Sequence, residues 1–122
     1  MADADAQIER FASDLIKYVR DRAIHDLWTV MSQKANDPTA RRWRQAGVSP
    51  DSEAMLRTVI PDVVDSTIFM LLDAIDNHRL RILVVQDGKT VDLYEAGMSE
   101  LGMEYAGSEW CRKYSKEPFY EN

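Results

Sequence analysis

Four aspartates in one strongly apolar segment are the residues of this sequence whose type and spacing best suit chemistry. The segment DVVDSTIFMLLDAID spans residues 62–76 and contains Asp62, Asp65, Asp73 and Asp76. Residues three or four positions apart share one face of a helix, so these four carboxylates form a single stripe. The opposite face, which we expect to be buried, carries Val64, Ile68, Leu71 and Ile75. The stripe has three interpretations: a solvated face, a surface for cations, or a site for a hard metal ion.

A metal site would use the oxygen ligands that Mg²⁺ and Ca²⁺ prefer. Carboxylate di-metal sites in helical proteins usually add a Glu-x-x-His pair from other helices, and the sequence contains no such pair. It contains no EF-hand loop either. His25 and His78 are far apart in the sequence, and we expect structural roles for both. We therefore predict no metal and no cofactor. A small metal-dependent enzyme that uses the stripe, with His25 or His78, is kept as an alternative.

Cations for the stripe are available in the segment ARRWR, which places Arg41, Arg42 and Arg44 around Trp43. Such a group can hold phosphate or stack on a nucleic-acid base. The net charge of −6 disfavours nucleic-acid binding, because the phosphate backbone is itself negative. We expect these arginines to pair with acidic groups of this fold or of a partner.

The negative charge is confined to the second half of the chain. Residues 1–61 hold nine basic and nine acidic residues, whereas residues 62–122 hold six basic and twelve acidic residues. An acidic field of this kind keeps a small protein in solution and repels anionic lipid, so we expect no membrane partner. It also accelerates the encounter with a cationic partner.

A second acidic group lies near the C-terminus beside an aromatic residue. Glu100, Glu104 and Glu109 precede Trp110, and an exposed aromatic side chain among carboxylates is typical of a protein interface. Cys111 has no local signature of a nucleophile. The sequence also lacks phosphate-binding loops and the serine-hydrolase motif, so we predict no catalytic residue.

The elements that must position these residues are mainly helical. Apolar spacings of three and four predict a long helix over residues 4–32. Its buried face is expected to contain Ile8, Phe11, Leu15, Val19, Ala23, Leu27 and Val30, with Arg20 on the solvated side. A short helix is expected over residues 39–45, followed by a helix start at Ser49-Pro50. Pro61 should kink the central helix or begin it anew, and that helix should continue to residue 77.

The apolar period changes after the central helix. Residues 80–95, LRILVVQDGKTVDLYE, alternate as a β-hairpin with Asp87-Gly88 at the turn and residues 91–94 on the return strand. Beyond Gly97 the sequence looks irregular until Ser108, which can cap a short helix that contains Trp110. We thus predict an α+β fold dominated by helices, in a single domain over residues 1–122.

The compartment follows from what the sequence contains. It has no run of the roughly 18–20 apolar residues that a membrane span needs. The acidic start MADADAQIER lacks the basic and apolar regions of a secretory signal. Together with the single cysteine, these features predict a cytoplasmic protein.

Size and charge favour a small cytoplasmic protein-binding module that engages a basic protein. A bacterial immunity or antitoxin protein, which must neutralise a cationic surface, has the same character, although this analogy rests on size and charge only. The predicted partner-binding residues are Asp62, Asp65, Asp73, Asp76, Glu100, Glu104, Glu109 and Trp110. Besides the metal-dependent enzyme, the other alternative is a structural homodimer paired through the edge of the hairpin.

Overall fold

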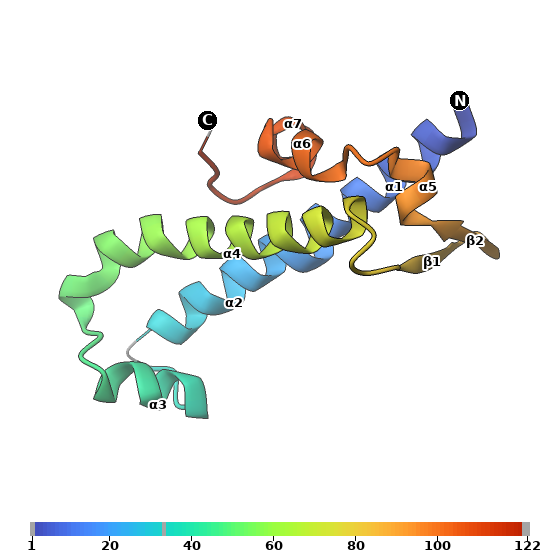
Figure 1. The fold of residues 1–122 in the computed structure, drawn as a ribbon. Coiled ribbons are helices and arrows are strands. Elements are labelled where there is room, and N and C mark those ends of the chain that lie inside the picture. The colour runs from blue at the N-terminus through green and yellow to red at the C-terminus, as the bar shows by residue number, and fades with distance from the viewer. Residues whose placement is uncertain (1, 33, 121–122) are drawn as a thin grey trace.

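The computed structural model describes residues 2–32 and 34–120 and shows a helix-dominated α+β fold (Figure 1). Three consecutive helical elements form one rod: α1 (Ala2–Leu15), the π-helical turn η1 (Ile16–Arg20) and α2 (Asp21–Met31). The rod confirms the long helix predicted from the apolar spacing.

The π turn changes which face of the rod is buried. A π turn holds more residues than an α turn, so the side chains that follow it are rotated about the helix axis. Ala12 and Leu15 are buried before the turn, Arg20 is buried at its last position, and Ile24 is buried after it. Val19 is 51% exposed. The prediction of a buried Val19 and a solvated Arg20 is therefore wrong, because the extra residue shifts the buried face by one position.

The predicted short helix is confirmed as α3 (Pro38–Gln45). It begins one residue earlier than predicted, because the Asp37 carboxylate accepts a hydrogen bond from the Ala40 amide at 2.7 Å and proline occupies the first turn. The next helix starts at the predicted place. Ser49 caps the short 3₁₀ turn η2 (Pro50–Ser52), with the reciprocal Ser52 side-chain bond to the Ser49 amide.

The central helix α4 (Glu53–Asp76) follows η2 and runs through Pro61 without a break, so no fresh start occurs there. Pro61 itself is buried, together with Ile68, Leu72 and Ile75 farther along the helix. Of the face predicted to be buried, Ile68 and Ile75 are buried and Val64 is partly buried, whereas Leu71 is 37% exposed.

The hairpin is shorter than the alternation suggested. Strands β1 (Leu83–Gln86) and β2 (Lys89–Asp92) pair antiparallel, with Gln86 opposite Lys89. The predicted turn residues Asp87 and Gly88 have φ angles of +52° and +77°, the left-handed pair that matches strand twist in a two-residue hairpin.

The return strand ends at Asp92 instead of reaching Tyr94, because a helix begins there. The Asp92 carboxylate accepts a hydrogen bond from the Tyr94 amide at 3.0 Å and caps α5 (Leu93–Gly97). Leu93, predicted to lie in a strand, is a fully buried helical residue instead.

Two short helices close the chain, α6 (Leu101–Ala106) and α7 (Glu109–Tyr114) (Figure 1). α6 packs on α4, whereas α7 packs on α6, α1 and η1. α7 was predicted, but the side chain of Ser108 makes no capping bond to it. α6 was not predicted, because glycines mark that segment as irregular. Its first amides are capped from another helix: the Asp76 carboxylate accepts from Leu101 at 3.1 Å and from Gly102 at 2.8 Å.

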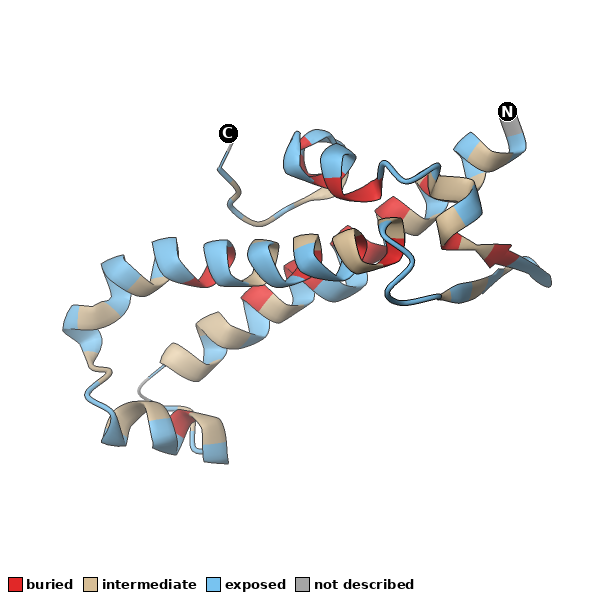
Figure 2. Cartoon of the chain, viewed as in Figure 1, coloured by how far each residue is buried: buried red, intermediate tan, exposed pale blue. Residues whose placement is uncertain are grey.

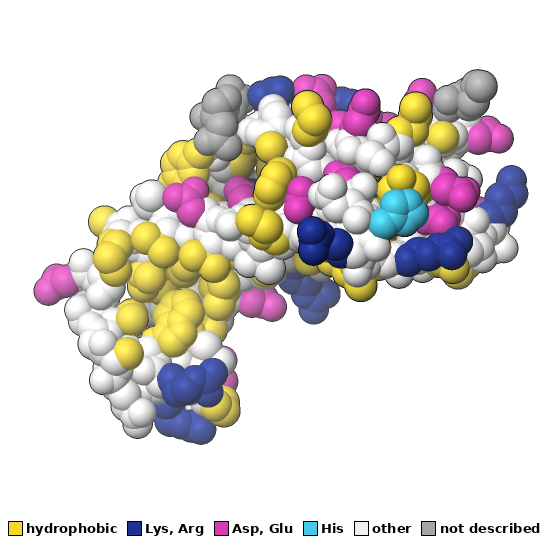
Figure 3. Space-filling model, in the orientation of Figure 1, with side chains coloured by type: hydrophobic (Ala, Val, Ile, Leu, Met, Phe, Trp, Pro, Cys, Tyr) yellow, Lys and Arg dark blue, Asp and Glu magenta, His cyan; other side chains and the backbone are white. Residues whose placement is uncertain are grey.

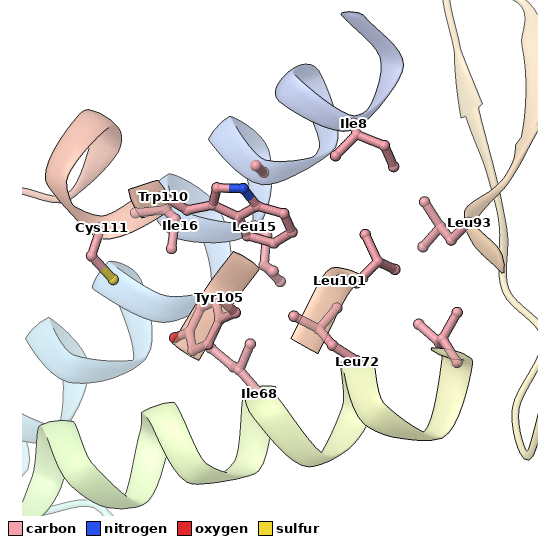
Figure 4. Close-up of a cluster of buried hydrophobic side chains, with 12 residues drawn as sticks. Ile8, Leu15, Ile16, Ile68, Leu72, Leu93, Leu101, Tyr105, Trp110 and Cys111 are labelled. Carbon is pink, nitrogen blue, oxygen red and sulfur yellow. The ribbon is translucent and has the colours of Figure 1, made fainter. Parts of the chain in front are cut away.

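The main hydrophobic core lies where α1, the C-terminal half of α4 and the C-terminal helices meet (Figures 2 and 4). Its buried members are Ile8, Ala12, Leu15, Ile16, Ile68, Leu72, Ile75, Leu93, Leu101, Tyr105, Trp110 and Cys111. α3 lies away from this core and buries only Ala40 among its own residues. None of the helices in the described parts of the chain is both long and apolar enough to cross a membrane.

Candidate functional site

A fully buried arginine, Arg20, joins the rod to α4 and to the C-terminal segment. Its Nε and Nη2 donate to the two carboxylate oxygens of Asp65 at 2.6 and 3.2 Å, which is the bidentate geometry of a strong Arg–carboxylate pair. Its Nη1 donates to Asp21 Oδ1 and to Ser115 Oγ, both at 3.0 Å. Nη2 also donates to the Pro118 carbonyl at 2.7 Å. The π turn puts Arg20 in this position, and π turns are frequent at functional sites.

Asp65 and Asp21 complete this centre. The Tyr105 hydroxyl donates to Asp65 Oδ1 at 2.5 Å. Asp21 accepts from Ser115 Oγ and from the Lys116 amide, each at 2.7 Å. Burial acts to lower the pKa of Arg20, but the hydrogen bond to Asp65 and the negative charge of the groups around it together outweigh burial, so the pKa of Arg20 is raised and the guanidinium stays charged. One guanidinium therefore faces two carboxylates, and the centre carries a net negative charge.

The aspartate stripe is thus not a uniform solvated face. Asp65 binds Arg20, and Asp76 caps α6. Asp73 accepts a hydrogen bond from the Asn77 side chain at 3.1 Å. Asp62 is exposed and has no hydrogen-bond or ion-pair partner among the residues that the structure describes.

The arginines expected to pair with the stripe bind elsewhere. Arg41 donates to the Asn36 carbonyl at 2.7 Å, and Arg44 donates to the Ala35 carbonyl at 2.6 Å. Arg42 donates to Thr39 Oγ1 at 3.1 Å. The internal cation of the stripe is Arg20. The sequence does contain a signal for a buried Arg20. Arg20 lies four residues from Ile16 and four residues from Ile24, so it falls in an apolar row of the helix.

The histidines do not join the stripe in a metal site. Across residues 2–32 and 34–120, no group of three or more His, Cys, Asp or Glu side chains could hold a metal ion. His25 is exposed, with its Nδ1 3.8 Å from Glu117. His78 packs on the Tyr94 ring with a centroid separation of 3.6 Å. The metal-dependent alternative therefore has no assembled ligand set in the described chain.

A cavity of about 380 Å³ opens beside the Arg20 centre, between α4, α6, α7 and the C-terminal segment. Its lining residues are Asp62, Asp65, Ser66, Phe69, Tyr105, Ala106, Ser108, Cys111, Phe119 and Tyr120. Sequence reasoning did not connect the aromatic residues of the C-terminus with the aspartates, because only the fold brings the two segments together. The cavity combines aromatic walls with the half-buried Asp65 and the exposed Asp62.

The pKa values of two groups of this cavity, Cys111 and Tyr105, are shifted away from the range of catalytic use. Burial raises the pKa of the Cys111 thiol to about 11, so a thiolate is scarce near neutral pH. Burial and then the hydrogen bond to Asp65 raise the pKa of Tyr105 above its ordinary range. A nucleophile or a general base needs a pKa closer to the working pH. Neither Cys111 nor Tyr105 meets this condition.

A second acidic group forms at α6, where the charges of Glu100 and of two residues of α1 act on Glu104. Figure 3 shows acidic side chains on this part of the surface. Partial burial raises the pKa of Glu104, and the negative charges of Glu100, Glu9 and Asp5 raise it further. The interactions of Asp5 and Glu9 with this group were not predicted, since nearly a hundred residues of sequence separate them from α6.

Two other residues predicted for this surface have different surroundings. Glu109 forms an ion pair with Arg112 at 3.0 Å, so its charge is locally compensated. Trp110 is only 2% exposed and packs edge-on against Phe11 and Tyr105, with ring centroids 6.3 and 6.1 Å apart. Trp110 therefore belongs to the core. Its predicted role in binding required an exposed side chain, and the side chain is buried.

Comparisons with known proteins do not assign the chain to a family. Neither a protein-family model, nor a curated protein, nor a solved structure shows a significant match to the chain.

Proposed function

We propose that this protein is a small cytoplasmic binding module for a basic protein, and that its aromatic cavity receives a lysine or arginine side chain of that partner. The observation that carries the proposal is the combination in one cavity of aromatic walls and the unpartnered carboxylate of Asp62. Both the face of an aromatic ring and a carboxylate attract cations.

The dimensions of the cavity agree with such a guest. Small-ligand pockets typically have volumes of about 300–1,000 Å³, and a volume near 380 Å³ suits one long side chain. Lysine and arginine carry an apolar stem that can lie along Phe69 and Phe119 while the charged end reaches a carboxylate. Because Arg20 largely neutralises Asp65, Asp62 supplies most of the direct attraction.

The acidic surface at α6 supports the same proposal at longer range. The negative charges of Glu100 and Asp5 act on Glu104, so a cationic partner would relieve this repulsion. Met103 on the same helix is 77% exposed and offers an adaptable apolar contact. A bacterial immunity or antitoxin protein that blocks a cationic surface would use these features in this way.

The test begins with affinity capture from lysate on the immobilised full chain at low and high salt, followed by mass spectrometry. The binding constant of each retained basic protein is then measured for wild type and for Asp62→Asn. We expect at least about a tenfold loss of affinity, because one charge-assisted contact is removed. The matched control is Asp26→Asn, an exposed carboxylate on α2, which changes net charge equally. Equal losses in the two variants would refute the cavity as the binding site.

A second measurement uses a defined probe and needs no identified partner. N-acetyl-arginine amide is titrated into labelled protein, and amide chemical shifts are followed. The proposal expects the largest shifts at Ser66, Phe69 and Phe119, and a loss of those shifts in Asp62→Asn. Shifts confined to another surface would contradict it.

A further inference from the structure

The chain exposes more surface than a monomer of its mass. Its accessible area is 7910 Å², whereas a monomeric protein of 14.0 kDa typically exposes about 6,700 Å². The excess, about 1,200 Å², exceeds the roughly 800 Å² that each partner buries in a standard interface. Figure 1 shows its source: α3 stands apart from the helices that form the main core.

Part of this surface is an apolar row on the outer face of α4. Met55, Val59, Val63 and Met70 are 59%, 42%, 58% and 60% exposed. Their positions fall on the side of the helix opposite the buried Ile68 and Leu72, with the small Ser66 between Val63 and Met70. Figure 3 shows hydrophobic side chains gathered over the N-terminal half of α4 and toward α3. A contiguous exposed apolar patch is a candidate interaction site.

The charges beside the row differ at its two ends. At the α3 end, Arg41 and Arg42 are exposed, and their guanidinium groups bond only neutral oxygens in the described chain. Toward the other end of α4, beyond Met70, lies the carboxylate of Asp73. An antiparallel copy of the molecule would place its basic end beside the acidic end of the first. A two-fold interface uses the same patch on both subunits, so the row and the opposed charges suit it.

We infer that a second copy of this chain covers the outer face of α4, packing Val59 and Val63 against their counterparts in an antiparallel homodimer. The α3 arginines of each copy lie toward the acidic half of α4 in the other. This inference does not rest on the proposed cavity, although Asp62 and Ser66 at the edge of the row also line that cavity, and it names a different surface from the hairpin edge.

The test is sedimentation velocity of the full chain over a wide concentration range, with far-UV circular dichroism to check helicity. Wild type is expected to sediment at twice the monomer mass. The double variant Val59→Lys/Val63→Lys is expected to be a folded monomer, with dimer affinity lowered roughly 100-fold or more because charges enter an apolar contact. Both side chains already face outward, so the fold itself should tolerate the change.

The matched control is Val85→Lys on β1, where the side chain is 74% exposed, and it should leave the dimer intact. The variant Arg41→Glu/Arg42→Glu should weaken the dimer about tenfold at low salt and less at high salt. A monomeric wild type, a dimer that survives the α4 double variant, or a dimer lost in Val85→Lys would overturn the inference. An unchanged dimer in the arginine variant would overturn its antiparallel arrangement.

Discussion

At the scale of single residues, the Arg20 side chain is the strongest constraint on the molecule. Its guanidinium is fully buried, and it is stable there because carboxylate, hydroxyl and carbonyl oxygens surround it. Taking an arginine out of water costs several kcal/mol unless such partners replace the water. Asp65 is the partner with the best geometry, and it also forms one wall of the cavity. The same carboxylate therefore serves stability and the proposed binding.

The first prediction concerns this pair. Asp65→Asn keeps the shape of the side chain but removes the charge opposite buried Arg20, and should lower the free energy of unfolding by about 3 kcal/mol. Tyr105→Phe removes only one hydrogen bond to the same carboxylate and should cost about 1 kcal/mol. Urea unfolding followed by tryptophan fluorescence measures both. Equal effects in the two variants would show that the Arg20–Asp65 pair is not the dominant contact.

At the scale of elements, the π turn η1 decides the surface of the rod. A regular α-helix would continue the buried face from Leu15 to Val19 and Ala23, as the apolar spacing suggests. The additional residue in the π turn instead presents Arg20 and Ile24 to the rest of the fold. Because of the turn, the charged side chain of Arg20 is buried in place of the apolar side chain of Val19, which lies at the surface.

Two matched substitutions test which residues of the rod are buried beyond the π turn. Val19→Lys should change the free energy of unfolding by less than about 0.5 kcal/mol, because surface changes are usually small. Ile24→Lys should cost more than about 3 kcal/mol, because it places a charge at a position with no exposed surface. Thermal or urea unfolding of the two variants gives the comparison. The reverse order would indicate a regular α-helix through residues 16–20.

At the scale of the whole molecule, the structure separates a packed end from an open end. The core and the cavity lie where α1, α4 and the C-terminal helices meet, whereas α3 and the outer face of α4 form the open end. The C-terminal segment is fastened to the packed end through Ser115, Lys116 and Pro118. Neutral Cys111 and Tyr105 belong to the same packed region, so their ionisation is coupled to folding of the entire chain.

Stability should therefore fall in alkaline solution. The pKa of Cys111 is raised from 9.0 to about 11, so above pH 9 the unfolded chain releases this proton more readily than the folded chain. The free energy of unfolding should be unaffected by this group below pH 9 and should decline by about 2 kcal/mol as the pH rises to about 11. Urea unfolding at a series of pH values measures the slope.

The control is Cys111→Ala, which lacks the thiol. Its curve should be flatter between pH 9 and 11 than that of wild type, whatever its stability at neutral pH. Parallel curves for the two proteins would show that the thiol is not protected from ionisation by the fold.

The sequence by itself determined the features that depend on neighbouring residues. The long rod, α3 with its Asp37 cap, the Ser49-Pro50 start and the Asp87-Gly88 turn all follow from local spacing and backbone preference. The fold class followed from these elements, since their periods are set by residues only a few positions apart. The acidic character of the second half was equally fixed by composition.

The tertiary structure decided the features that depend on contacts between distant segments. The first amides of α6 donate hydrogen bonds to Asp76 on another helix, and no pattern within residues 101–106 predicts this cap. Arg20 is buried because Asp65 and Pro118, 45 and 98 residues away, supply its partners. Such pairings exchange hydration for contacts that exist only after the chain has folded, and for that reason the candidate site could not be read from spacing alone.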